Sequence, residues 1–489
     1  MKSLLYANVG LTSKQIGLTA QIISDLSAKS EDMDIVLCDN VLKNCYFNRT
    51  HNLLGCASCQ ARMHLVLDAN GISNRNMIKL EHLTTSFDAG PIRSTKELEG
   101  IEYEGINIGR GVASSIISFT RQFEISDGNY AELIRLDLIK AANVVSNMKK
   151  ILRKGYDHVY IFNGRFSECW PVVELCRHLK IPFSTFESGA GLNYELFEGG
   201  LPHSILLRHK EINRIWKEAN EIEREDIANE WFKRRRNKDE RLERSFTKHQ
   251  SERMLPEGFD KTSRNILILN SSEDEVKSIQ EWNTHLYQSQ NQAIRDLMGA
   301  FHGRSDFTFY LRVHPNLEEV KNVQMEEIRN FNFDNLIVID PEDPVDTYFL
   351  IENCEKSLCF GSTSGIEATY WGKPSILYGN SFYRDQGCVY LPKSLSDLVE
   401  LVLEKEIPAM PVSSCLPYAY YMSTYGKSPV LFSFSGSIDS EFNGVRLGKM
   451  PLKSFWFLAR YIKSFRIWRQ MHRAVFGQRL QFKDLFKYK

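Results

Sequence analysis

The sequence lacks the features that define several large classes of protein. Its 489 residues contain no apolar run near the ~18 residues that a membrane-spanning helix requires. Lys plus Arg and Asp plus Glu both total 61, so the net charge points to no class of partner. The chain has no internal repeat and no low-complexity tract. Its first residues, MKSLLYANVG, lack the sustained apolar region and cleavage site of a signal peptide, and we expect them to form a buried strand.

The cysteines bear on the compartment in which the protein is expected. Ten cysteines are present, and several, including Cys38 and Cys359, lie in apolar stretches. A chain of this length without a signal sequence normally keeps its thiols reduced in the cytosol. We therefore expect a cytoplasmic protein.

What is present is a clear alternation of strands and helices between residues 256 and 410. Short apolar runs predict strands at 265–270, 307–313, 335–340, 356–360 and 374–378. Helices are expected at 275–300, 317–330, 345–353, 364–371 and 394–405. Continuous apolar strands separated by helices predict a parallel sheet covered on both faces, and such sheets bind ligands at the carboxyl ends of their strands.

The rest of the chain predicts a second α/β lobe and two further segments. Strands are expected at 3–9, 34–38, 158–163 and 181–187, and a long helix at 129–153. The predicted parts are an N-terminal lobe (1–210), a charged helical connector (211–255), a second lobe (256–410) and a basic helical tail (411–489). The expected fold class is α/β, with two Rossmann-like, doubly wound lobes facing a cleft and additional C-terminal helices.

The first motif is His314-Pro315, directly after the strand expected at 307–313. Pro315 restricts the backbone of His314 to extended conformations, which fixes the direction of the imidazole. At the ligand edge of a sheet, this ring can donate a hydrogen bond to a phosphate oxygen or protonate a leaving phosphate. An ordinary loop histidine is the alternative.

The second motif is GSTSG at 361–365, which follows the strand expected at 356–360. The hydroxyls of Ser362, Thr363 and Ser364 precede a helix, and hydroxyls with free backbone N–H groups at such a place favour an anion. Glu367 lies one turn into this helix, where its carboxylate can accept hydrogen bonds from ribose hydroxyls. The alternative is a capped helix without any ligand.

Together the two motifs resemble a known group of enzymes. Residues 261–405 are similar to the nucleotide-binding lobe of bacterial capsule and surface-polysaccharide glycosyltransferases, in His314-Pro315, in GSTSG and in Glu367-Ala368 followed by Gly372-Lys373-Pro374. The group includes capsule Kdo transferases and HP-motif sialyl- and polysialyltransferases. The resemblance implies a GT-B fold and a nucleotide-sugar donor, CMP-activated in the most similar cases.

The resemblance also implies roles for individual residues. It assigns the donor phosphate to His314, with Pro315 beside it, and to Ser362, Thr363 and Ser364, and it assigns the ribose to Glu367. His314 is additionally a catalytic candidate. Asn270, Ser271 and Ser272 follow the first strand of the same lobe and are expected on the donor side.

The N-terminal lobe is expected to bind the acceptor and to supply a general base. Asn163 and Arg165 follow one predicted strand, and Glu187 ends the next. A carboxylate near the acceptor hydroxyl can accept its proton in an inverting transfer. Glu187 is the favoured candidate, with Glu104 and Glu168 as alternatives. Arg110, in the glycine-rich stretch at 105–111, is a further acceptor-side candidate.

A cysteine-rich stretch at 38–63 raises the question of a metal. Cys45, His51, Cys56 and Cys59 are types of residue that bind zinc, but their spacing is not that of a zinc finger. A structural zinc and buried thiols both remain open. The transfer itself is expected to need no cofactor and no metal held by an Asp-x-Asp motif.

The tail carries the one pronounced charge imbalance. Residues 451–489 hold ten Lys or Arg and a single acid, Asp484. Within it, 454–476 predicts a basic, aromatic-rich amphipathic helix. Such a helix binds a membrane surface peripherally, or buries its apolar stripe against the protein.

These features favour a cytoplasmic glycosyltransferase that moves a sugar from a nucleotide donor to a growing surface polysaccharide or a lipid-linked acceptor. One alternative is a polyol-phosphate transferase of the CDP-glycerol type, although only His314 is well placed in the donor lobe where those enzymes use paired histidines. Another is an inactive subunit of a polysaccharide assembly complex. No nucleic-acid partner is expected.

Overall fold

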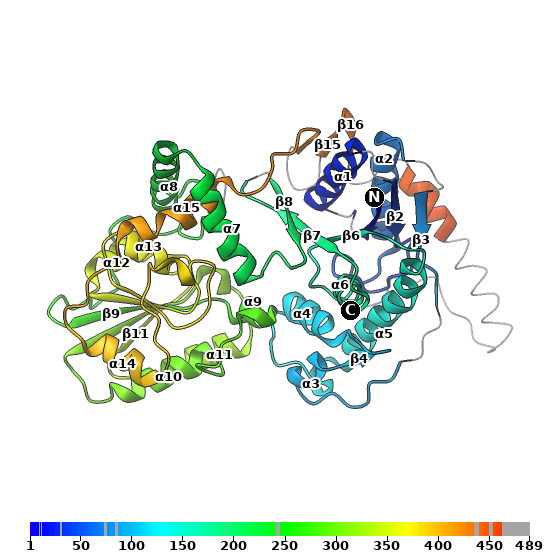
Figure 1. Cartoon of the computed structure of the whole chain (residues 1–489). Helices are drawn as coiled ribbons and strands as arrows, with labels where there is room; N and C mark the ends of the chain where they lie inside the picture. Colours follow the sequence, from blue (N-terminus) through cyan, green and yellow to red (C-terminus); the bar gives the residue numbers. More distant parts are fainter. Residues whose placement is uncertain are drawn as a thin grey trace. The chain divides into compact units, whose positions relative to one another are not determined.

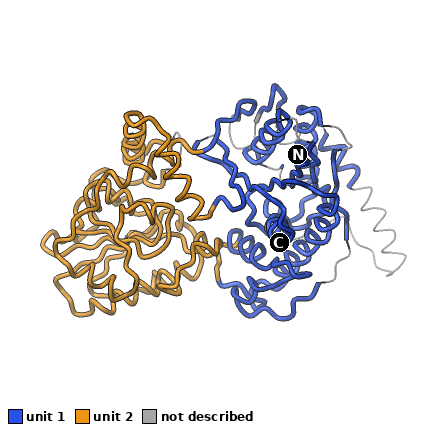
Figure 2. Tube along the Cα trace, in the orientation of Figure 1, with its two compact units in different colours: residues 1–119, 124–202, 426–489 blue, residues 120–123, 203–425 orange. Residues whose placement is uncertain are grey.

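The computed structural model of the chain describes residues 1–8, 10, 12–29, 32–72, 76–83, 87–191, 193–240, 245–434, 440–448 and 453–461. The chain forms two compact units (Figure 2). Unit 1 comprises Met1–Phe119, Glu124–Pro202 and Gly426–Lys489, and unit 2 comprises Thr120–Phe123 and His203–Tyr425. The end of the chain therefore returns to the unit in which the chain begins.

Unit 1 is built on a six-stranded sheet with the strand order β3-β2-β1-β6-β7-β8 (Figure 1). The strands are β1 (Lys2–Ala7), β2 (Asp32–Leu37), β3 (Met77–Lys79), β6 (His158–Phe162), β7 (Phe183–Ser188) and β8 (Tyr194–Glu198). All neighbouring pairs are parallel except β7 and β8. The four strands predicted in this half are confirmed.

The helices of unit 1 connect these strands in the manner of a doubly wound sheet. They are α1 (Ser13–Ala28), α2 (Leu53–Ala69), α3 (Thr95–Glu99), α4 (Gly109–Thr120), α5 (Asp127–Leu152) and α6 (Trp170–Leu179), and a two-stranded ribbon of β4 (Glu102–Tyr103) and β5 (Ile106–Asn107) precedes α4. From β1 the chain proceeds through β2 to β3, and it then returns to add β6 on the other side of β1. The strand order therefore reverses between β1 and β6, which places the loops after these two strands at the usual ligand position of such a sheet.

Unit 2 contains a five-stranded, wholly parallel sheet with the order β11-β10-β9-β12-β13. Its strands are β9 (Arg264–Leu269), β10 (Phe307–Arg312), β11 (Leu336–Ile339), β12 (Lys356–Cys359) and β13 (Ser375–Leu377). All five predicted strands are confirmed. The strand order reverses between β9 and β12.

The apolar strands of unit 2 are buried on both faces. Alternate residues of β9 enter different cores: Leu267 and Leu269 pack on one side of the sheet, and Ile266 and Ile268 on the other. Because successive side chains of a strand point to opposite faces, a strand covered on both sides is mostly apolar rather than alternating. This is the physical origin of the short apolar runs in the sequence.

Helices cover the two faces of the sheet of unit 2. They are α9 (Glu273–Lys277), α10 (Gln290–Ala300), α11 (Val323–Arg329), α12 (Thr347–Asn353), α13 (Ser364–Tyr370) and α14 (Leu395–Leu403), with short 3-10 turns at η2 (Gln280–Trp282), η3 (Pro315–Leu317), η4 (Arg384–Gln386) and η5 (Val412–Ser414). The prediction of one helix over 275–300 was wrong. Trp282 Nε1 donates to the carbonyl of His203 at 2.9 Å, and the Ser289 hydroxyl accepts from Gln292 N at 3.1 Å, so a new helix is capped at Ser289.

The helix predicted over 317–330 is likewise shorter than expected. Residues 315–317 form the turn η3, and the Asn322 side chain then caps α11 by accepting from Met325 N at 3.0 Å. Asn322 is 1% exposed. A buried, hydrogen-bonded cap therefore fixes the start of this helix, which periodicity alone does not reveal.

The charged segment at 211–255 contributes to the core of unit 2. It forms most of α7 (Ile205–Glu218) and all of α8 (Glu221–Arg236), and α15 (Leu416–Thr424) packs against both helices. Trp231 is 2% exposed and Phe232 is fully buried. The interpretation of this segment as a solvated helix thus holds for its charged outer residues but not for the face that carries these two aromatic rings.

After unit 2 the chain returns to unit 1 and pairs with it. Three short strands, β14 (Phe432–Phe434), β15 (Ser440–Phe442) and β16 (Val445–Arg446), form a small antiparallel sheet. The ring of Phe432 lies over α1 at Gly17, where a Cβ atom would come within 2.1 Å of the ring. Only glycine at position 17 therefore leaves room for the Phe432 ring to pack against α1.

The described part of the tail also packs on unit 1. Residues 453–461 are helical, and Phe457 and Tyr461 pack against Ala57 and Ala61 of α2. The rest of the helix predicted at 454–476 lies outside the described residues. On the same short helix Phe455 and Trp456 are exposed by 55% and 63%.

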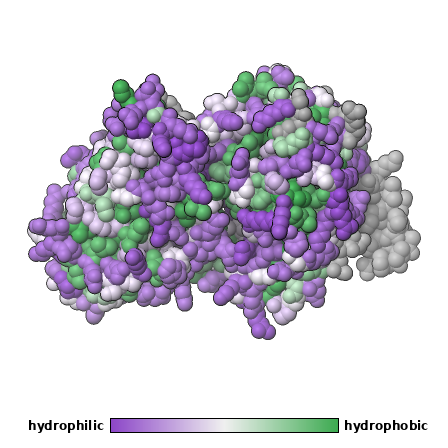
Figure 3. Space-filling view, in the orientation of Figure 1, coloured by the Kyte–Doolittle hydropathy of each residue, from purple (hydrophilic) through white to green (hydrophobic). Residues whose placement is uncertain are grey.

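No helix among the described residues is long and apolar enough to cross a membrane. On the face that Figure 3 shows, hydrophilic residues predominate on each unit, and smaller hydrophobic patches are scattered over each.

A buried network of charges joins three segments of unit 1. Asp137 on α5 is fully buried and accepts from Arg49 Nη1 at 2.6 Å, Asn44 Nδ2 at 2.7 Å and Lys140 Nζ at 3.0 Å. Lys140 Nζ also lies 3.4 Å from Glu168 Oε2. The buried carboxylate of Asp137 lies beside two buried cations, Arg49 and Lys140. Its negative charge offsets the free-energy cost of burying their positive charges.

This network predicts a large loss of stability for Asp137→Ala. Removal of the carboxylate leaves Arg49 and Lys140 without their shared counter-ion, and we expect the free energy of unfolding to fall by about 3–5 kcal/mol. Urea denaturation followed by circular dichroism measures it. On the same helix Glu132 pairs with Arg135 on the surface, so Glu132→Ala should change stability by less than about 1 kcal/mol. Equal effects of the two variants would contradict the role given to Asp137.

Candidate functional site

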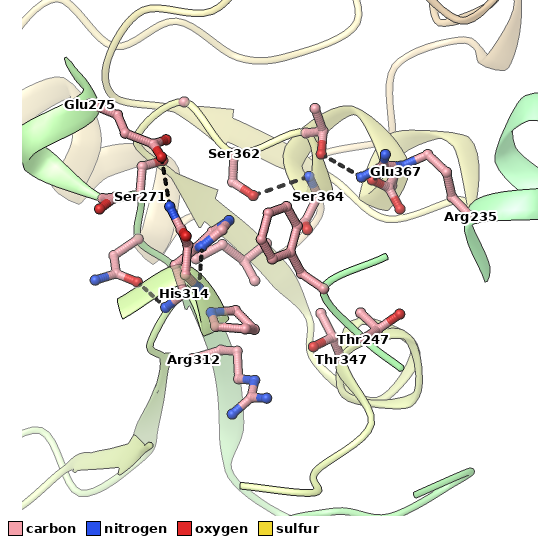
Figure 4. A pocket seen from close by; sticks show the side chains of 18 of the residues that line it. Arg235, Thr247, Ser271, Glu275, Arg312, His314, Thr347, Ser362, Ser364 and Glu367 are labelled. Atoms are coloured by element: carbon pink, nitrogen blue, oxygen red, sulfur yellow. Dashed lines mark hydrogen bonds and ion pairs between the residues drawn. The ribbon is translucent and has the colours of Figure 1, made fainter. Parts of the chain in front are cut away.

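A cavity of about 500 Å³ lies in unit 2 at the carboxyl ends of β9, β10 and β12 (Figure 4). This is the point where the strand order of the parallel sheet reverses, so the loops that leave β9 and β12 diverge and leave space between them. All nine residues predicted on the donor side line it: Asn270, Ser271, Ser272, His314, Pro315, Ser362, Thr363, Ser364 and Glu367. The structure thus brings them to one place, and their role as ligand contacts stays a prediction.

His314 is held in one orientation by its own loop. Its backbone N–H donates to Asn270 Oδ1 at 2.8 Å, and its Nδ1 accepts from the backbone N–H of Asn316 at 3.1 Å. Since Nδ1 is an acceptor, the proton of the neutral imidazole resides on Nε2. The ring edge also meets Phe246, with 5.2 Å between the ring centroids. His314 therefore offers the cavity a single, directed N–H donor.

Burial favours the neutral form of His314, and nearby positive charges add to the effect. Burial lowers the pKa of His314 to about 4, and the charges of Arg312, Arg121 and Arg235 add to this effect. A ligand that brings negative charge would oppose the effect of the three guanidinium groups and raise this pKa. Two of these arginines are already paired with carboxylates, Arg121 with Asp274 and Arg235 with Glu367.

The loop between β12 and α13 supplies hydroxyl groups. The hydroxyl of Ser362 accepts from Ser364 N at 3.3 Å, and the carbonyl of Ser362 accepts from the hydroxyl of Tyr383 at 2.5 Å. Gly361 has φ 151°, and a Cβ atom there would lie 2.9 Å from the carbonyl of Asn380. Glycine thus permits the sharp exit from β12 that turns these hydroxyls toward the cavity.

Glu367 is already engaged by two residues of unit 2. Its Oε1 accepts from Arg235 Nε at 2.9 Å, and its Oε2 accepts from the hydroxyl of Tyr348. Arg235 Nη2 also donates to Thr363 Oγ1 at 2.8 Å. Glu367 is 2% exposed. Its carboxylate therefore ties α8 and α12 to α13, and any contact with ribose would be additional to these bonds.

Two arginines at the cavity were not singled out from the sequence. Arg312 is 2% exposed, and its Nη atoms donate to the carbonyls of Asp340 and Asp343. Burial lowers the pKa of Arg312 to about 10. The sequence could have indicated Arg312, because it is a charged residue within the apolar strand predicted at 307–313. It gave no such signal for Arg235, which lies in the charged run WFKRRR of α8.

The candidates of unit 1 are only partly assembled. Asn163 Nδ2 donates to Glu187 Oε2 at 2.7 Å, so the ends of β6 and β7 bring these two residues together. Arg165 Nη1 donates to the hydroxyls of Ser114 at 2.9 Å and Ser118 at 2.8 Å on α4. Arg110 has an exposed side chain at the start of the same helix. Glu187 thus has a partner that can orient its carboxylate.

The two alternative carboxylates are in other environments. Glu168 is 1% exposed and accepts from Tyr46 N at 2.9 Å within the buried charge network. Glu104 lies in the turn of the β4–β5 ribbon, where its ion pair with Lys149 lowers its pKa. Neither lies at the end of a strand of the main sheet. Glu187 is the candidate whose position suits a general base.

The cysteine-rich stretch does not form a cluster of metal ligands. Cys56 Sγ lies 4.0 Å from His51 Nδ1, and Cys59 Sγ accepts from the backbone N–H of Gly10 at 3.2 Å. Burial raises the pKa of Cys59 to about 12 and that of Cys45 further still. Within the described part of the chain, no group of three or more His, Cys, Asp or Glu residues is placed to hold a metal ion.

Comparisons with known proteins find similarity only among solved structures. No protein-family model and no curated protein matches the sequence. The chain is similar to KpsC of Thermosulfurimonas dismutans, in the structure described as a beta Kdo 2,4 transferase, at 15% identity and a TM-score of 0.34, over 54% of this chain and 80% of that one. The beta Kdo 2,7 transferase of the same protein gives 13% identity and a TM-score of 0.32, over 56% and 80%.

An epimerase is also among the similar structures. The UDP-GlcNAc 2-epimerase of Neisseria meningitidis, bound to UDP-GlcNAc, has 12% identity and a TM-score of 0.27, over 95% of this chain and 100% of that one. Capsule Kdo transferases are thus among the similar structures, as in the resemblance seen in the sequence. At these TM-scores the likeness adds no argument about the reaction.

The lowered pKa of His314 predicts a specific dependence of stability on pH. The ordinary pKa of histidine is about 6.5, so as the pH falls the unfolded chain gains the proton before the folded protein does. The contribution of His314 to stability is therefore complete above about pH 6.5 and is lost as the pH falls toward 4. The difference in unfolding free energy between wild type and His314→Gln, from urea denaturation, should grow from pH 4 to pH 6.5. A constant difference over this range would contradict the neutral state of His314.

Proposed function

We propose that the chain is a glycosyltransferase that takes its sugar from a nucleotide-activated donor and holds the nucleotide in the cavity of unit 2. The supporting observation is the composition of that cavity. A neutral histidine with a directed N–H, three serine or threonine hydroxyls and the buried guanidinium of Arg312 line one space at the reversal point of a parallel sheet. This set of donors suits a phosphate group on a bound nucleotide.

The chemistry required of these groups is stabilisation of a leaving phosphate. In the transfer, the bond between the anomeric carbon and a phosphate oxygen breaks, and a bond from that carbon to the acceptor oxygen forms. Negative charge develops on the departing oxygen. A hydrogen bond from His314 Nε2–H and the nearby charge of Arg312 stabilise this charge, and they do so best because they are fixed before the reaction.

Unit 1 is proposed to bind the acceptor, with Glu187 as the base that accepts the hydroxyl proton. Asn163 holds one oxygen of this carboxylate, and the backbone N–H of Ser188 donates to the other at 2.9 Å. Such bonds orient the carboxylate. A growing surface polysaccharide or a lipid-linked glycan is the proposed acceptor, and the ten basic residues of 451–489 favour an anionic membrane surface nearby.

The proposed function leads to a prediction about nucleotide binding. Calorimetric titration with CMP, CDP, UDP and GDP should show binding to the wild type, and His314→Ala should raise the Kd of the preferred nucleotide about 10- to 100-fold, because a hydrogen bond to a charged phosphate is lost. His302 is exposed in the same unit and does not line the cavity. His302→Ala is therefore the control and should bind as wild type does. Absence of binding by all four nucleotides would overturn the proposed function.

Another prediction of the proposed function separates catalysis from nucleotide binding. Glu187→Gln should lower the rate of sugar transfer about 10²- to 10⁴-fold, since the amide cannot accept the proton. The Kd of the nucleotide should not change, because that site belongs to unit 2. Transfer is followed by release of nucleotide in the presence of acceptor. Glu198→Gln, an exposed change at the end of β8, is the control, and an equal loss of rate in both variants would exclude Glu187 as the base.

A further inference from the structure

A buried hydroxyl group contacts the GSTSG loop of unit 2 from the core. It belongs to Tyr383, which is fully buried and lies between β13 and the turn η4. The hydroxyl donates to the carbonyl of Ser362 at 2.5 Å, and Cys359 Sγ lies 3.5 Å from the hydroxyl oxygen. Ser362 lines the cavity and Tyr383 does not. The tyrosine therefore supports the loop from the side opposite to the one that a ligand would meet.

The second glycine of the GSTSG loop leaves room for this hydroxyl. Gly365 lies in the first turn of α13. A Cβ atom at this position would lie 2.6 Å from the hydroxyl oxygen of Tyr383 and closer still to Cys359 Sγ. Because protein interiors are closely packed, a larger residue at 365 would displace one of these groups. The glycine thus permits the close approach of Tyr383 to the loop.

The tyrosine is itself held in place. Its ring packs edge-on against Tyr418 of α15, with 5.5 Å between the ring centroids. Its carbonyl accepts from the backbone N–H of Gln386 at 3.1 Å and from Cys388 Sγ at 3.5 Å. Burial raises the pKa of Tyr383 well above its usual value, so the hydroxyl keeps its proton. Tyr383 is therefore a fixed hydrogen-bond donor.

The bond from Tyr383 sets the direction of one peptide unit in the loop. A peptide unit is planar, so the direction of the Ser362 carbonyl also sets that of the Thr363 N–H, which points the opposite way. The same carbonyl accepts from the backbone N–H of Gly365 at 3.1 Å, a bond within the loop and its helix. The bond from Tyr383 instead ties the loop to a separate segment of the core. Rotation of this peptide unit would move Ser362 and Thr363, which lie on either side of it.

We infer that Tyr383 is a positioning residue for the donor phosphate, because its hydroxyl holds the 361–364 loop in the conformation that places Ser362, Thr363 and Ser364 at the cavity. This inference rests on the proposed function. Tyr383 does not line the cavity and acts through the loop. Hydrogen-bond donors that are fixed before the ligand arrives bind it more tightly, because no free energy is then lost in ordering them.

The test is Tyr383→Phe in the full-length protein, which removes one oxygen atom and keeps the ring. Calorimetry with the nucleotide that the wild type prefers among CMP, CDP, UDP and GDP should give a Kd about tenfold higher in the variant, since a less ordered loop must be fixed on binding. The ³¹P chemical shift of the bound nucleotide at saturation should also differ from that in the wild type, because the surroundings of the phosphate change. Circular dichroism and the melting temperature establish that the variant folds.

Tyr378→Phe is the matched control. Tyr378 is 2% exposed, does not line the cavity, and donates its hydroxyl to a backbone carbonyl, that of Leu286, at 3.3 Å. This variant loses the same kind of bond from the core of unit 2, so a general loosening of the core would affect both variants. Tyr378→Phe should keep the Kd and the ³¹P chemical shift of the wild type.

The inference is wrong if Tyr383→Phe binds the nucleotide as the wild type does, or if both variants weaken binding equally. A higher Kd with an unchanged ³¹P chemical shift would also overturn it, because the loss would then not arise at the phosphate. In each of these cases the wild type still binds a nucleotide, so the proposed function survives. If the wild type binds none of the four nucleotides, the proposed function fails and this inference fails with it.

Discussion

The candidate site depends on the wholly parallel arrangement of the sheet in unit 2. Parallel strands place all their carboxyl ends on one edge, and the strand order reverses between β9 and β12. The loop after β9 therefore leaves toward one side and the loop after β12 toward the other. The space that remains receives Asn270 from one loop and Ser362 from the other, with His314 from the neighbouring β10. No single motif makes this site, because each contributes one wall of it.

Much of this arrangement could be predicted from the sequence, because it follows from local patterns. Strands buried on both faces are mostly apolar, so β9 to β13 were visible as short, mainly apolar runs. A polar residue directly after such a run must lie on the ligand edge, which is why Asn270, His314 and Ser362 could be assigned to one place. Their chemistry was then inferred from residue type, and the structure adds the tautomer of His314 and the partners of Glu367.

The residues that sequence reasoning missed reach the cavity over long distances in the chain. Arg235 lies 132 residues from its partner Glu367, and Gln250 lies 97 residues from Thr347. Arg235 belongs to a helix whose charged residues resemble any solvated surface, and only the burial of Trp231 beside it shows which face is covered. The interruptions of the helices at 275–300 and 317–330 were missed for a related reason, since side chains such as Ser289 and Asn322 cap helices only in the folded context.

The return of the chain to unit 1 has a consequence for the order in which the protein can fold during synthesis. Lys427 N donates to the carbonyl of Tyr194 at 2.7 Å, the backbone N–H of Leu431 donates to Gln21 Oε1 at 3.2 Å, and Phe432 covers Gly17. Domains generally fold as units from the N-terminus as they leave the ribosome. In this chain, the face of α1 that Phe432 covers stays uncovered until the ribosome has made all of unit 2. Unit 2 is continuous apart from residues 120–123, so it is the unit that can complete its core first, and a nascent chain paused before residue 427 would expose apolar surface to chaperones.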